Sequence, residues 1–86
     1  MNNDPLTLDE ELELLTLTPA QRQALQDLSD ATTLLRECLK HGRTRPDWTV
    51  RYATVYHQFR DRYLDAMGRA IRLGVSDGLV RRAVGL

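Results

Sequence analysis

Apolar residues recur at alternating steps of four and three along two long stretches of this chain. The first stretch carries Ala24, Leu28, Ala31, Leu35 and Cys38. The second carries Tyr52, Tyr56, Phe59, Tyr63, Ala66, Ala70 and Leu73. This spacing places each set along one face of a helix, as in helices that pack side by side. The pattern therefore predicts an all-α protein built around two long amphipathic helices, with no strand signal.

Residues that favour helix ends frame the first stretch. Thr18 can cap the free N–H groups of a helix, and Pro19 has the backbone angle that a first helical position needs. Gly42 can adopt the left-handed conformation that ends many helices. We therefore expect the first long helix over about 18–41.

The second long helix is expected over about 46–73, from Pro46 to the residue before Gly74. The connection between the two helices is short, so the second helix must turn back along the first. The sequence thus predicts an antiparallel helical hairpin in which the numbers of facing residues sum to about 87. The facing pairs would be Leu35 with Tyr52, Ala31 with Tyr56, Leu28 with Phe59 and Ala24 with Tyr63.

Two short helices are expected on either side of the hairpin. One covers about 8–15 behind Thr7, and the other about 77–84 behind Ser76, because Thr and Ser are favoured helix caps. We expect residues 1–86 to form one small helical domain in which 1–6 are flexible.

Large apolar residues are left over beside the hairpin seam. They are Leu25, Leu34, Leu39, Trp48, Val55, Leu64, Met67 and Ile71. The terminal helices can cover part of this surface, with Leu8, Leu12, Leu15 and Leu17 from one and Leu79, Val80 and Val84 from the other. A homodimer forming a four-helix bundle would cover the rest. The alternative is a compact monomer with both terminal helices folded back.

Charge divides the chain, although the whole protein is neutral. Residues 1–39 carry eight acids and two arginines, a net charge of −6, and residues 40–86 carry ten basic residues and four acids, a net charge of +6. The two halves can attract one another within the fold, which is the interpretation we favour. Alternatively, the basic half faces an anionic partner.

Several protein classes are excluded by the sequence. No apolar run approaches the roughly 18 residues that a membrane span requires. The polar, acidic N-terminus does not resemble a signal peptide. A single cysteine, Cys38, cannot form an internal disulfide and fits a reducing cytoplasm. We therefore expect a cytoplasmic protein that binds no membrane.

The sequence contains no recognised catalytic pattern. It has no Gly-rich phosphate loop, no His-Glu-x-x-His and no Cys-x-x-Cys. Its candidate groups are Cys38, His41 and His57. Cys38 lies on the predicted seam as a small core residue, and the predicted register places His57 too far along the hairpin from His41 for shared metal binding or a nucleophile–base pair. We expect no enzyme activity, no metal, no cofactor and no small-molecule substrate.

The segment Ala70-Ile-Arg-Leu-Gly74-Val-Ser-Asp-Gly-Leu-Val80 resembles the helix-turn-helix DNA-binding motif. The match lies in the spacing of Ala70, the turn Gly74 and Val80. The resemblance implies a recognition helix over 77–84. It also implies DNA contacts from Arg81 and Arg82, with Arg69, Arg72, Arg43 and Arg45 as candidate backbone contacts. Two alternatives stay open. Residues 79–86 also resemble the first helix and turn of the motif, and 77–84 can instead be a closing helix with solvated arginines.

We expect a small regulatory or adaptor protein that binds another protein of unknown identity, with homodimerisation as part of this expectation. The candidate interface residues are Trp48, Leu64, Met67 and Ile71. The small size and the lack of catalytic motifs also suit an accessory protein of a phage or mobile element. The alternative function is DNA-binding transcriptional regulation.

Overall fold

The computed structural model describes residues 5–43 and 53–85. These residues form α-helices and no β-strand, as expected from the sequence. The helices are α1 (Leu8–Thr16), α2 (Pro19–Arg43), α4 (Ala53–Arg72) and α5 (Asp77–Val84). None of the described helices is both long and apolar enough to cross a membrane.

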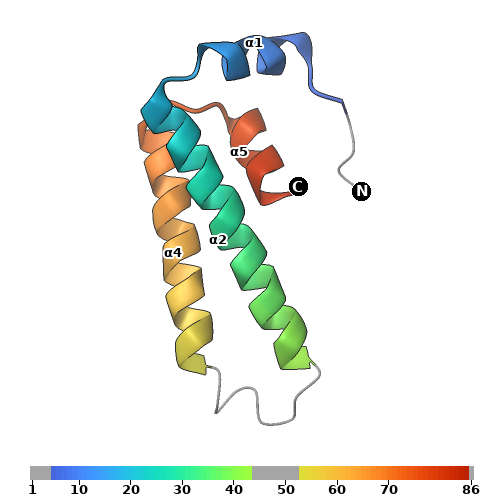
Figure 1. Cartoon of the computed structure of the whole chain (residues 1–86), viewed down its shortest axis with the longest axis vertical. Coiled ribbons are helices and arrows are strands. Elements are labelled where there is room, and N and C mark those ends of the chain that lie inside the picture. Colours follow the sequence, from blue (N-terminus) through green and yellow to red (C-terminus); the bar gives the residue numbers. More distant parts are fainter. Residues whose placement is uncertain (1–4, 44–52, 86) are drawn as a thin grey trace.

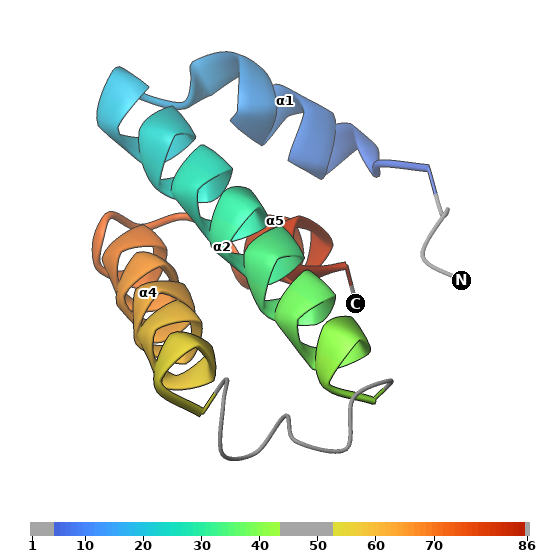
Figure 2. The ribbon, with the colours of Figure 1, turned by 60° about the horizontal axis from the view of Figure 1, so that its bottom comes forward.

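Helices α2 and α4 form the long antiparallel pair (Figure 1). Helix α5 packs against both of them near the end of the hairpin where α2 begins. A third helix therefore covers about half of the length of the hairpin. Helix α1 crosses that same end beyond α5 (Figure 1), and Figure 2 shows α1 lying apart from the α2–α4 pair. The molecule measures 46 × 26 × 15 Å.

The register of the hairpin differs from the prediction. Arg69 on α4 forms an ion pair with Asp27 on α2 at 3.3 Å, and the Gln21 side chain donates to the Leu73 carbonyl at 2.8 Å. The numbers of facing residues therefore sum to about 95, not 87. The predicted value assumed a turn between Gly42 and Arg45. The described helices instead end at 43 and begin at 53, so the point of symmetry lies farther along the chain.

This register changes which side chains meet across the seam. Ala31 and Ala66 line the same groove between α2 and α4, so Ala31 lies near the level of Ala66 and not of the predicted Tyr56. Ala24 and Ala70 are likewise both buried in one cluster with Leu28, which is fully inaccessible. Small residues let two helix backbones approach closely, and Leu28 fills the space beside them.

The core lies where α2, α4 and α5 meet. Its buried residues are Leu17, Ala24, Leu28, Ala66, Ala70, Val75, Leu79, Val80 and Val84. Most predicted seam positions on α2 are buried, but Leu73 is 38 % exposed because α4 ends before it. The prediction that Leu17 and the α5 residues cover apolar surface of the hairpin is confirmed, since Leu17, Leu79, Val80 and Val84 are all buried in the core. The same prediction for Leu8, Leu12 and Leu15 is wrong, since all three side chains are exposed.

The helix ends agree with the sequence prediction at most positions. Helix α5 has the predicted bounds, and α1 extends one residue farther than expected. Gly42 does not end its helix, which continues to Arg43, because glycine within a helix costs only about 1 kcal/mol relative to alanine. The predicted start of the second helix at Pro46 lies outside the described residues.

A tight turn joins α4 to α5. The Val75 N–H donates to the Ala70 carbonyl at 3.1 Å and the Gly74 N–H to the Ile71 carbonyl at 3.0 Å. Gly74 has a φ of 84°, which completes a Schellman motif and favours glycine. Ser76 then caps α5 by accepting from the Leu79 N–H at 3.3 Å. This turn brings α5 back onto the hairpin.

Arg36 on α2 secures the end of α5. Its guanidinium donates to the Val84 carbonyl, where a cation is favoured by the exposed carbonyls of a helix C-terminus. Gly85 has a φ of 79°, and a Cβ atom at this position would lie 2.6 Å from the same guanidinium. The left-handed φ favours glycine here, and a Cβ atom would also displace the Arg36 guanidinium.

Candidate protein interface

The start of helix α1 is fixed by a capped first turn. The Thr7 hydroxyl accepts from the Glu10 N–H at 3.2 Å, and the Glu10 carboxylate accepts from the Thr7 N–H at 3.0 Å. This reciprocal arrangement is a capping box, which satisfies two N–H groups that a helix start leaves free. The orientation of Glu10 is thereby tied to the start of the helix.

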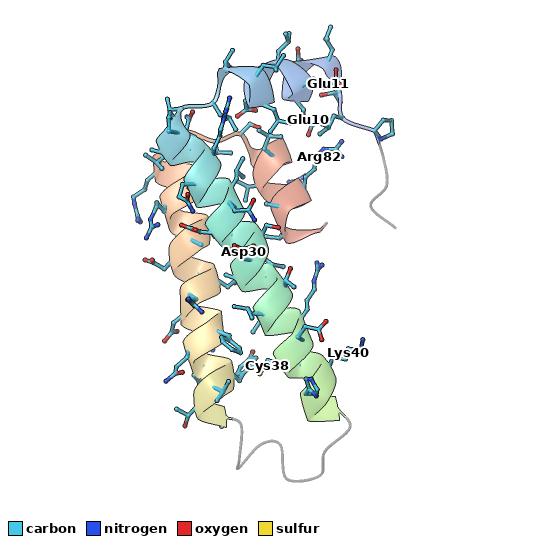
Figure 3. All side chains as sticks on the ribbon, viewed as in Figure 1. Glu10, Glu11, Asp30, Cys38, Lys40 and Arg82 are labelled. Atoms are coloured by element: carbon cyan, nitrogen blue, oxygen red, sulfur yellow. The ribbon has the colours of Figure 1, made fainter. Side chains whose placement is uncertain are left out.

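The inner face of α1 attaches to α5 through carboxylates. Glu10 accepts from the Arg82 Nε and Nη2 atoms at 2.9 and 3.0 Å. Glu13 accepts from the Ser76 N–H at 2.9 Å. Figure 3 shows Glu10 and Arg82 side by side between the two helices. Leu14 packs against the core cluster on the same side, so α1 is held by both polar and apolar contacts.

The Glu10–Arg82 pair is partly shielded from solvent. The two side chains are 15 % and 28 % exposed. Hydrogen bonding from Arg82, followed by the Thr7 backbone N–H, lowers the pKa of Glu10 to about 2. A charge-assisted bidentate pair of this kind fixes orientation more firmly than a solvent-exposed pair.

The outer face of α1 is apolar. Leu8, Leu12 and Leu15 are 70, 52 and 75 % exposed. They follow one another at steps of four and three and thus form one continuous stripe. The exposed acids Asp9 and Glu11 lie to either side of it. We call these three leucines the α1 face. Helix α1 thus turns carboxylates toward the protein and leucines toward solvent.

A second apolar stripe lies on α4. Leu64 and Ile71 are 50 and 58 % exposed, and Gly68 lies between them on the same side of the helix. We call these three residues the α4 stripe. Met67 is half-buried and packs against the core, so it contributes less open surface than expected. Trp48 lies outside the described residues.

Three of the six arginines of the DNA-binding hypothesis form ion pairs with acidic residues. Arg82 pairs with Glu10, Arg81 with Asp77 at 2.9 Å, and Arg69 with both Asp27 and Asp65 at 3.3 and 3.4 Å. Arg72 is exposed. Arg43 ends α2, and Arg45 lies outside the described residues. Of the four arginines whose side chains the structure describes, three are therefore neutralised by acidic partners.

Helix α1 also covers part of the predicted recognition helix. A Cβ atom on Gly78 would lie 2.9 Å from the Glu10 carboxylate, so α1 approaches the first turn of α5 closely. In a helix-turn-helix protein this part of the recognition helix contacts the bases. Here it faces an acidic helix.

An open groove of about 350 Å³ runs between α2 and α4. Ala31, Ala66 and Leu34 supply its apolar lining, and Asp27, Asp30, Asp65, Arg62 and Arg69 supply its charges. Its acids and arginines largely neutralise one another. Within residues 5–43 and 53–85, no three metal-binding side chains come together. The groove therefore suggests no specific chemistry.

Sequence reasoning did not identify the α1 face. The spacing of Leu8, Leu12 and Leu15 predicts that they cover apolar surface beside the hairpin seam, whereas the structure exposes all three. A stronger indication was the Thr7–Glu10 capping box, which orients Glu10 and hence the opposite face of the helix. No family model, curated protein or solved structure matches this chain.

Proposed function

We propose that this protein is a non-enzymatic adaptor or regulatory protein that binds another protein through the α1 face. The observation behind this proposal is the high exposure of Leu8, Leu12 and Leu15 on a helix that is fixed to the domain. Burying one leucine side chain is worth about 1.5–3 kcal/mol. Three such residues in one stripe can anchor an amphipathic helix of a partner.

The attachment of α1 supports the same proposal. A helix as short as α1 is unstable alone in water, but the contacts from Glu10, Glu13 and Leu14 hold it in place. Its leucines are therefore presented in a fixed geometry before binding. Preorganisation of this kind lowers the entropic cost of association.

Site-specific photo-crosslinking tests the proposal. A photoreactive phenylalanine analogue replaces Leu12 in one variant and Thr33, an exposed residue on α2, in a control variant. We expect defined protein adducts at position 12 and none of the same adducts at position 33. If position 12 yields no adduct in the native cell, the proposal is wrong.

DNA binding is a second candidate function, and the turn before α5 favours it. Gly74 has the left-handed conformation of a motif turn, and Ala70 and Val80 are buried at the two core positions. The ion pairs of the arginines and the position of α1 oppose it. We therefore place it second.

A mobility-shift assay with duplex DNA tests this second function. Binding through phosphates should weaken steeply with salt and should fall in the double variant Arg72→Ala/Arg81→Ala. These two arginines are exposed, so their replacement should preserve the fold. Failure of the protein to retard DNA at low salt would remove this function.

A further inference from the structure

We propose that the partner of the α1 face is a second copy of this chain, which contributes its α4 stripe. This inference rests on the function proposed above and specifies its partner. Each copy carries both surfaces, so a two-fold symmetric pair can form the contact twice.

The two surfaces have matching spacing. The leucines of the α1 face stand at 8, 12 and 15, and the α4 stripe stands at 64, 68 and 71. Both sets therefore follow the same steps of four and three along a helix. When the helices lie antiparallel, Leu8 meets Ile71, Leu15 meets Leu64, and Leu12 meets Gly68.

Gly68 supplies the space that this pairing needs. Leu12 is the central side chain of the α1 face, and glycine leaves a gap at the centre of the α4 stripe. A side chain inserted over a small residue in a facing helix is the basis of close helix packing. Apart from the backbone of α4 itself, the atom nearest to the absent Cβ of Gly68 is the Arg72 Nη1, at 3.3 Å, so this flexible side chain must move aside when Leu12 enters.

Charge favours this pairing over the packing of two α1 faces. Helix α1 contains Asp9, Glu10, Glu11 and Glu13 and no basic residue. The α4 stripe is flanked by Arg60 and Arg72 and by Asp61 and Asp65, so its surroundings carry no net charge. In the antiparallel arrangement Arg72 lies beside the acidic first turn of α1. Two α1 faces packed together would instead bring Asp9 and Glu11 of both copies close, which is unfavourable.

The mass in solution is the first test. Light scattering coupled to gel filtration should give about twice the 9.9 kDa of the chain at micromolar concentration. Leu12→Gln should weaken association about tenfold or more, the change expected when one leucine is no longer buried. Leu39→Gln, an exposed leucine on α2 outside both surfaces, is the matched control and should leave the mass unchanged. A monomeric wild-type chain would overturn the inference.

Disulfide trapping tests which surfaces meet. Cys38 is first replaced by alanine, and a Leu12→Cys chain is then mixed with a mass-tagged Gly68→Cys chain. We expect oxidation to give mainly the mixed 12–68 disulfide. Formation of only 12–12 or only 68–68 links would contradict the inference, because α1 would then meet α1 or α4 would meet α4. Absence of any link would contradict it too.

The outcomes separate this inference from the function on which it rests. If position 12 photo-crosslinks a different protein and the chain is monomeric, the adaptor function stands and self-association is wrong. If position 12 yields no adduct at all, both are wrong.

Discussion

At the scale of single residues, Glu10 and Arg82 connect the two halves of the chain that carry opposite charge. Glu10 belongs to the acidic half and Arg82 to the basic half, and Asp27 with Arg69 makes a second such link. Acidic residues of the first half thus neutralise arginines of the second half through contacts inside the molecule. The interpretation in which the halves attract one another therefore has direct support from these two pairs.

The Glu10–Arg82 pair predicts how stability depends on pH. Because the pKa of Glu10 is about 2 in the folded protein and 4.5 ordinarily, its contribution is complete above pH 4.5 and is lost as the pH falls toward 2. Urea unfolding measured across this range should show the loss, and Glu10→Gln should reduce it. Asp77→Asn removes an exposed pair with Arg81 and should retain most of the acid-induced loss. An unchanged pH profile in Glu10→Gln would contradict the prediction.

Two glycines should respond in opposite directions to replacement by alanine. Gly85→Ala should destabilise the protein by about 1–2 kcal/mol, because alanine is strained at the left-handed φ of 79°. Gly68→Ala, in a helical conformation, should raise the stability of the monomer by about 0.8–1 kcal/mol. Denaturant unfolding at low protein concentration measures both. Equal effects of the two changes would show that backbone conformation at these two glycines does not decide the stability change.

At the scale of elements, each helix is amphipathic, but the face that it buries depends on its neighbours. Helices α2, α4 and α5 bury their apolar faces against one another. Helix α1 turns Glu10, Glu13 and Leu14, which are half-buried, toward the protein and exposes its leucine stripe. The carboxylates of α1 accept hydrogen bonds from two groups at the start and end of α5. Arg82 donates to Glu10 and the Ser76 N–H donates to Glu13, and these contacts fix the orientation of α1.

This difference predicts unequal effects of removing leucines from α2 and α1. Leu28→Ala should lower the free energy of unfolding by about 2–5 kcal/mol, since the side chain is fully buried among the three packed helices. Leu15→Ala, at a side chain that is 75 % exposed, should change it by less than about 0.5 kcal/mol in the monomer. Urea titrations of both variants give the comparison. A large loss in Leu15→Ala would mean that α1 packs with its leucines inward.

At the scale of the whole molecule, the chain is elongated for its length. Its radius of gyration is 14.9 Å, whereas a compact domain of this size is expected near about 12 Å. The third helix covers only half of the hairpin, which leaves a small core. A core of this size supports only marginal stability, so association should contribute measurably.

The melting temperature should therefore rise with protein concentration, because a dimer binds only folded chains. Circular dichroism at low and high micromolar concentrations measures this dependence. Leu12→Gln should abolish most of it, and Leu39→Gln should not. A melting temperature independent of concentration would show that the folded chain does not associate in this range.

The sequence by itself determined the helical class, the hairpin and most helix ends. These features follow from the spacing of apolar residues within a helix and from caps such as Ser76, which act over a few neighbouring residues. Only the tertiary structure decided the register of the hairpin and the orientation of α1. The register depends on where α2 and α4 meet, and the pairing of Asp27 with Arg69 shows an offset that the period of the pattern could not provide. The orientation of α1 depends on the ion pair of Glu10 with Arg82, two residues far apart in the chain. This contact competes with the burial of Leu8, Leu12 and Leu15, so the sequence alone could not show which face of α1 is exposed.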